Sequence, residues 1–216
     1  MVWAASADLQ NNGKKVIALE LPKGADERKI EVVDHTPDGG LYFAHGRALC
    51  SGRRVHIEHF PQYLKKYGGG AIPDYGNLYR LNYVSDRFKD IVESIEPNLH
   101  QFIPFQIIGP KKVVLADMYF MVVCNRLDSV DREETTLILD GGAMWMQHQN
   151  VPREDWPPNF NPHRAPRFVF NLSQIGENHL WYDKHSIYGP YLSDALAEAL
   201  IASPVTGIKL AKQESV

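Results

Sequence analysis

The chain lacks the features that mark membrane-spanning, secreted or disulfide-stabilised proteins. No stretch approaches the ~20 consecutive apolar residues that a membrane-spanning helix needs. Residues 1–9 lack a basic start followed by an apolar core, so no signal peptide is predicted. The 2 cysteines, Cys50 and Cys124, are far apart and form no C-x-x-C motif. We therefore expect a cytoplasmic protein with reduced thiols, unless a leader was removed.

The chain also lacks a basic excess. It carries 23 Lys and Arg against 26 Asp and Glu, a formal net charge of -3. Proteins that bind nucleic acid or anionic membranes non-specifically usually carry a clear positive excess, so neither partner is expected. A chain of 216 residues can bury a sizeable core without disulfides or metals, as one domain or as two small lobes.

Recognisable catalytic motifs are absent as well. The sequence contains no G-x-S-x-G, no phosphate-binding G-x-x-x-x-G-K-[ST] and no G-x-G-x-x-G. His56 and His59 form H-x-x-H, whose spacing differs from the H-E-x-x-H zinc motif. We therefore predict no catalytic residue, cofactor or metal. The alternative is a small hydrolase or metal-dependent enzyme that uses Cys50 or the His56/His59 pair.

Two helices are predicted to begin at the same dipeptide, Ser85-Asp86 and Ser193-Asp194. A serine at this position can accept a hydrogen bond from a free amide of the first turn, and the aspartate favours the positive end of the helix dipole. Helical spacing then places apolar residues on one face of each helix: Phe88, Ile91, Val92 and Ile95 in the first, and Ala195, Leu196, Ala199 and Leu200 in the second. The similarity of residues 84–107 to 192–210 indicates either an internal duplication or a common helix start used twice.

Apolar runs bounded by turn residues predict the strands. They are 30–33, 102–108, 113–123, 137–139, 168–170, 179–182 and 205–210, with a long loop over 65–76 and a loose tail over 211–216. Five prolines over 150–166 exclude regular structure there and predict an ordered surface excursion. The expected fold is α+β, with mostly antiparallel sheets and two amphipathic helices packed against them. We expect a strand- and loop-rich region over 1–80, packed on an α+β region over 81–216.

The candidate partner-binding residues are four acids and one aromatic: Asp128, Asp131, Glu133, Glu134 and Trp156. The acids could neutralise a basic partner, but such a run can equally be a solvated loop. Tryptophan is enriched where protein interfaces concentrate their binding energy, although buried packing explains it equally well. These residues are the sequence's best candidates for a recognition surface.

Several segments, taken in order, resemble the DUF1629 family, also described as Imm11 immunity proteins. The resemblance starts with Tyr83-Val84-Ser85-Asp86-Arg87-Phe88-Lys89-Asp90 and Phe102-Ile103-Pro104-Phe105. It continues with Tyr119-Phe120-Met121-Val122-Val123-Cys124-Asn125 and Leu127-Asp128-Ser129-Val130-Asp131. It ends with the helix Leu192–Leu200 and Val205-Thr206-Gly207-Ile208. It covers roughly residues 80–212, and the proline-rich segment 150–166 is not part of it.

The resemblance implies a bacterial immunity protein that binds a cognate polymorphic or contact-delivered toxin in the producing cell. It supplies no catalytic residues. Stoichiometric inhibition of that toxin is the leading hypothesis, and a structural or regulatory interaction module without a toxin partner is a further possibility. The sequence leaves the oligomeric state open.

Overall fold

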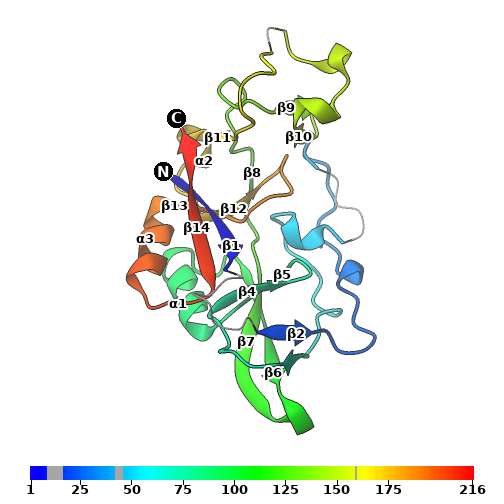
Figure 1. The fold of residues 1–216 in the computed structure, drawn as a ribbon, viewed down its shortest axis with the longest axis vertical. Coiled ribbons are helices and arrows are strands. Elements are labelled where there is room, and N and C mark those ends of the chain that lie inside the picture. Colours follow the sequence, from blue (N-terminus) through cyan, green and yellow to red (C-terminus); the bar gives the residue numbers. More distant parts are fainter. Residues whose placement is uncertain (9–16, 42–45, 159) are drawn as a thin grey trace.

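The computed structural model describes residues 1–8, 17–41, 46–158 and 160–216. Within them the chain forms two six-stranded sheets, one two-stranded hairpin and three α-helices (Figure 1). The first sheet is ordered β11 (Val169–Phe170), β14 (Ile208–Ser215), β1 (Val2–Ala7), β13 (Tyr191–Ser193), β12 (Leu180–Asp183), β8 (Arg126–Leu127). The second is ordered β2 (Ala18–Glu20), β3 (Tyr63–Tyr67), β6 (Gln101–Ile108), β7 (Val114–Val122), β5 (Leu81–Val84), β4 (Tyr75–Leu78). The hairpin is β9 (Ile138–Asp140) with β10 (Met144–Met146), and the helices are α1 (Asp86–Ile95), α2 (Leu172–Ile175) and α3 (Asp194–Ala202).

The predicted α+β class is confirmed, since most strand pairs are antiparallel. The parallel pairs in the two large sheets are β3 with β6, β11 with β14 and β8 with β12. Residues 1–80 supply β1 to the first sheet and β2, β3 and β4 to the second, so this stretch is hydrogen-bonded into both sheets. No helix in the described part of the chain is long and apolar enough to cross a membrane.

Both predicted helices begin where the serine caps were expected. The hydroxyl of Ser85 accepts a hydrogen bond from the amide of Phe88, and that of Ser193 accepts one from Leu196. The buried face of α1 carries Phe88 and Val92 as predicted. On α3 the buried residues are Leu196, Ala197 and Leu200, whereas Ala195 is exposed. The prediction for α3 was therefore wrong at Ala195, and the short helix α2 was not predicted.

Some predicted strands differ from the observed ones for reasons of pairing. The tail 211–216 was expected to be loose, but β14 runs to Ser215 because β1 pairs along one edge and β11 along the other. The predicted strand 30–33 is reduced to a single bridge between Val32 and Val55. The predicted loop 65–76 is shorter, because its ends belong to β3 and β4.

Each of the two six-stranded sheets contains one copy of the same structural unit. In the first unit, β3, β4, β5, α1, β6 and β7 follow one another in the chain, and the strands lie in the order β3-β6-β7-β5-β4. In the second unit, β11, the short helix α2, β12, β13, α3 and β14 follow one another, and the strands lie in the order β11-β14-β1-β13-β12. The directions of all corresponding neighbours agree, including the single parallel pair. The N-terminal strand β1 thus takes the central place in the second unit that β7 takes in the first.

The correspondence of the units extends to single hydrogen bonds at the helix caps. The amide of Ser85 donates to the carbonyl of Asp74, just before β4, and the amide of Ser193 donates to the carbonyl of His179, just before β12, both at 2.9 Å. The serine hydroxyls also contact the side chains of these partners, Asp74 Oδ1 and His179 Nδ1, at 2.7 Å in each case. Of the two interpretations of the Ser-Asp dipeptides, the structure therefore supports an internal repeat.

The central strands of the two units repeat a second contact. Trp3 of β1 donates its indole N–H to Asp194 at 2.8 Å, and Tyr119 of β7 is hydrogen-bonded to Asp86, which raises the pKa of the Tyr119 phenol. Each aspartate is the first residue of its helix, so each central strand is tied to the start of the helix that crosses over it.

One core lies where the two units meet. Helices α1 and α3 contact each other and lie side by side in Figure 1. The apolar side chains of this core come from both units and both sheets: Ala5, Tyr75, Val84, Phe88, Val92, Met121, Val123, Leu180, Tyr182, Leu192, Leu196 and Leu200. A second core lies on the opposite face of the second six-stranded sheet, under β6 and β7. A third core surrounds Trp181. Because one core joins both units, neither unit buries its helix alone.

Candidate functional site

The acidic segment is only partly available to a partner. Asp128 lies 2.9 Å from Arg132 and 3.1 Å from Lys184, and these cations outweigh burial, which alone would raise the pKa of Asp128, so that its pKa is lowered. Asp131 accepts hydrogen bonds from the backbone amides of Glu133 and Glu134 and from the side-chain amide of Asn171. Its pKa is lowered chiefly by these amide hydrogen bonds. Two of the four predicted acids thus hold the segment's own structure.

Glu133 and Glu134 differ from these two aspartates. Both side chains are exposed, on the turn that Asp131 caps. They are the acidic candidates that a partner could reach without breaking an intramolecular contact.

Trp156 anchors the proline-rich excursion. Its ring packs against His148 and Phe160, with centroid separations of 5.4 Å in both cases, and Arg153 lies over it. The indole N–H donates to the carbonyl of Val151. These contacts hold the excursion together. Trp156 is partly exposed, so part of its side chain remains accessible to solvent.

Sequence reasoning missed the buried carboxylate that fixes the acidic segment. Asp183, at the end of β12, is fully buried and accepts the amide and hydroxyl of Ser129 at 2.8 and 2.9 Å and the amide of His185 at 2.8 Å. Burial raises the pKa of Asp183. The signal available in the sequence was an acid directly following the apolar strand 179–182. Its bonds are all internal, and they position the backbone that carries the segment.

The structure does not bring Cys50 and His56 to one site. Cys50 lines a small cavity of about 50 Å³ with Arg47, Arg80, Ser186 and Ile187. Burial raises the pKa of its thiol, which disfavours the thiolate that nucleophilic catalysis requires. His56 and His59 are exposed and line a different cavity with Glu31 and Glu58. Among the residues that the structure describes, no group of three or more His, Cys, Asp or Glu side chains is placed to hold a metal.

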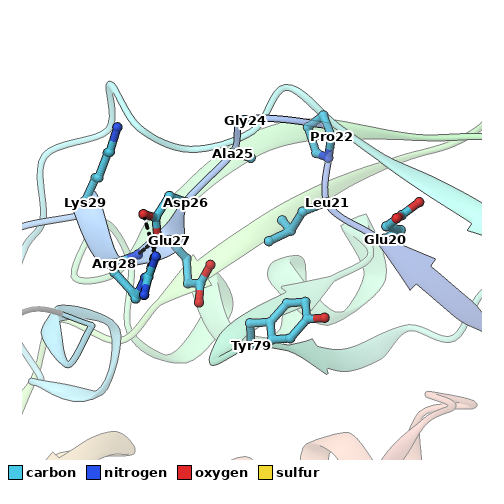
Figure 2. A pocket seen from close by; sticks show the side chains of 10 residues that line it. All are labelled: Glu20, Leu21, Pro22, Gly24, Ala25, Asp26, Glu27, Arg28, Lys29 and Tyr79. Atoms are coloured by element: carbon cyan, nitrogen blue, oxygen red, sulfur yellow. Dashed lines mark hydrogen bonds and ion pairs between the residues drawn. The ribbon is translucent and has the colours of Figure 1, made fainter.

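An open groove lies beside the β4–β5 turn, and sequence reasoning also missed it (Figure 2). Its volume is about 650 Å³. One side is the segment that follows β2, including the 3-10 turn Glu27–Lys29, and the other is Tyr79. The lining residues are Glu20, Leu21, Pro22, Gly24, Ala25, Asp26, Glu27, Arg28, Lys29 and Tyr79. A second cavity, with His56 and His59, shares Arg28 and Lys29 with it, so the two are adjacent.

The turn that carries Tyr79 has an unusual backbone. Tyr79 and Arg80 both adopt left-handed conformations, with φ of 50° and 69°. Two-residue hairpin turns of this kind strongly favour Asn-Gly, because bulky residues at positive φ are strained by about 1 kcal/mol or more. Tyr79 is nevertheless 62% exposed, so burial of its ring does not offset this strain. Strain of this kind concentrates at functional sites.

The exposed groove and the strained aromatic turn thus lie together on one part of the surface. The sequence model of the Imm11 immunity protein family matches residues 30–215. The chain therefore belongs to the Imm11 immunity protein family. This confirms the resemblance seen over 80–212 and extends it to residue 30 and through the proline-rich segment. No curated protein matches the chain.

Proposed function

We propose that this protein neutralises a cognate bacterial toxin, polymorphic or contact-delivered, by binding it stoichiometrically in the cytoplasm of the producing cell. The observation that carries the proposal is membership of the Imm11 immunity family over residues 30–215. A rigid scaffold with a shared core and an exposed groove supports it, since inhibition by binding requires a preformed surface. Neither nucleic acid nor membrane is proposed as a partner.

The test uses the toxin encoded beside this chain. Co-expression should restore growth, and the two proteins should co-purify as a complex. In a titration of toxin activity, a stoichiometric inhibitor removes activity in proportion to its amount and completes inhibition at an equivalence point. Full inhibition by a small fraction of an equivalent, increasing with time, would instead show an enzyme acting on the toxin.

The enzyme alternative is tested in the same assay. Cys50→Ala and His56→Ala should neutralise the toxin as well as the unaltered chain does, because these residues line separate cavities and burial raises the pKa of the Cys50 thiol. Loss of protection by both folded variants would support the enzyme instead. Failure of abundant, folded unaltered protein to protect the cell would contradict the proposed function.

A further inference from the structure

The groove of Figure 2 contains a carboxylate and an aromatic ring that are both free to meet a partner. Figure 2 shows Leu21 and Glu27 extending toward Tyr79, whereas Lys29 extends away from it. Among the residues that the structure describes, no donor is hydrogen-bonded to the Glu27 carboxylate. Tyr79 is 62% exposed. The groove thus has an apolar side, an aromatic surface and, beside Tyr79, the carboxylate of Glu27.

Of the other charged groups of the groove, Asp26, Arg28 and Glu20 have partners within the chain, and Lys29 extends away from Tyr79 (Figure 2). Asp26 forms an ion pair with Arg28 at 2.8 Å, and the hydrogen bonds from Arg28 lower the pKa of Asp26. Glu20 is hydrogen-bonded to Tyr67, whose pKa is raised by that bond. Internal pairing therefore leaves Glu27 as the acid directed at Tyr79.

This arrangement fits the side chain of an arginine or lysine. A cation over a tyrosine ring is attracted by the electrons of the ring face, and a carboxylate at its edge supplies a charge-assisted hydrogen bond. The methylene groups of either side chain can pack on Leu21. Tyrosine also gives large contact area with few rotatable bonds, which limits the entropy lost on binding.

The second unit provides an internal comparison for Tyr79. Its β12–β13 connection carries Tyr188, which is equally exposed at 62%. Tyr188 contacts Phe168 rather than lining this groove. The two tyrosines thus match in exposure and in place within their units, and they differ in surroundings.

We propose that the groove formed by residues 20–29 and Tyr79 is where the chain binds its toxin, and that it takes a basic side chain of the toxin between Tyr79 and Glu27. The inference rests on the proposed function. Residues 20–29 lie outside the range 30–215 that the family model matches, whereas Tyr79 lies within it.

The test measures the dissociation constant of the complex with catalytically inactivated toxin by calorimetry. Tyr79→Ala should weaken binding about 30-fold, as for a central interface aromatic, and Glu27→Gln about tenfold. Tyr188→Ala and Glu177→Gln, at exposed residues that do not line the groove, are the matched controls and should change the constant less than about threefold. Glu134→Gln tests the acidic segment as the competing contact. Thermal unfolding of each variant checks that the fold is intact.

The outcomes separate the two proposals. If the unaltered chain does not bind the toxin, the proposed function fails. If it binds but folded Tyr79→Ala and Glu27→Gln variants bind equally well, the groove is not the site. A loss confined to Glu134→Gln would place the contact on the acidic segment and overturn the groove.

A second measurement tests the ligand chemistry without the toxin. The protein is labelled with ¹⁵N and titrated with N-acetylarginine amide, then with the neutral analogue N-acetylcitrulline amide. Amide shifts at Tyr79 and within residues 20–29 that appear only with arginine are expected, and Glu27→Gln should abolish them. Equal shifts with citrulline would overturn the requirement for a cation.

Discussion

The two units of the molecule agree in their scaffold and differ in their connections. Both units have the same strand order, a serine-capped helix and an aromatic residue of the central strand bonded to the first aspartate of that helix. They differ at the connection between the two strands that precede the capped helix: β4 and β5 are joined by two residues in the first unit, and β12 and β13 by a longer loop in the second. They differ also at the central strand, which follows β6 through a hairpin in the first unit and comes from the N-terminus in the second. The repeated parts bury and pair their groups, whereas the strained Tyr79 and the groove lie in parts that do not repeat.

The largest expected effect comes from removing the strand that completes the second unit. Deleting residues 1–8 removes β1, which pairs with both β13 and β14 and buries Val2 and Ala5. Without it these strands have no partner between them, so we expect loss of the folded state, measured by circular dichroism and amide spectra. A synthetic peptide of residues 1–8 should restore some structure. A truncated chain that unfolds cooperatively at an unchanged temperature would contradict the assigned role of β1.

A circular permutant tests the role of β1 by joining it covalently to β14 instead of removing it. The two termini lie side by side, because Val2 pairs with Gln213 (Figure 1). A short glycine-containing linker from Val216 to Met1 would join β14 and β1 as a hairpin, as β6 and β7 already are. The permuted chain would start at Ile17 and end at Asp8, without residues 9–16. Permutation between adjacent termini is usually tolerated, so its free energy of unfolding should lie within about 1–2 kcal/mol of the original.

The next largest effect concerns the core that the units share. Phe88→Ala on α1 and Leu196→Ala on α3 remove corresponding side chains that are 2% and 1% exposed. Each should lower the free energy of unfolding by about 3–5 and 2–5 kcal/mol respectively. Because both helices pack in one core, each variant should show a single urea transition followed equally by fluorescence and circular dichroism. Ile201→Ala, at an exposed position of α3, is the control, and two separate transitions would show that the units fold independently.

The sequence predicted those features that depend on residues close together in the chain. The helix starts at Ser85 and Ser193 were found because capping depends on residues within one turn. The tail 211–216 was missed because β14 is held by β1 from the opposite end of the chain. The acidic candidates were found as a run of charge, but the sequence does not show that Asp131 is used by its own turn and Asn171. The groove was missed because it joins residues 20–29 to Tyr79, which only the fold brings together.

The smallest predicted effect concerns the helix caps, where the two units use different side chains as the partner of the capping serine. Asp74 holds the place in the first unit that His179 holds in the second. Burial raises the pKa of Asp74, but hydrogen bonds from Ser85 and Thr206 outweigh it, so the pKa lies below the ordinary value. A lowered carboxyl pKa stabilises the folded state above the unfolded-state pKa of about 3.9, and this stabilisation is lost as the pH falls through the folded-state value.

Asp74→Asn should therefore reduce the free energy of unfolding by about 1 kcal/mol at pH 7, the typical contribution of such a hydrogen bond. The difference from the unaltered chain should shrink as the pH falls below about 4, because the carboxylate that the variant lacks is then protonated in the original as well. Urea unfolding at a series of pH values measures it, with Asp90→Asn on the exposed side of α1 as the control for removing a charge. A difference that stays constant down to pH 3 would show that the ionised form of Asp74 adds nothing to the cap. The two units would then be stabilised at this point by hydrogen-bond geometry alone, whether the partner of the serine is an aspartate or a histidine.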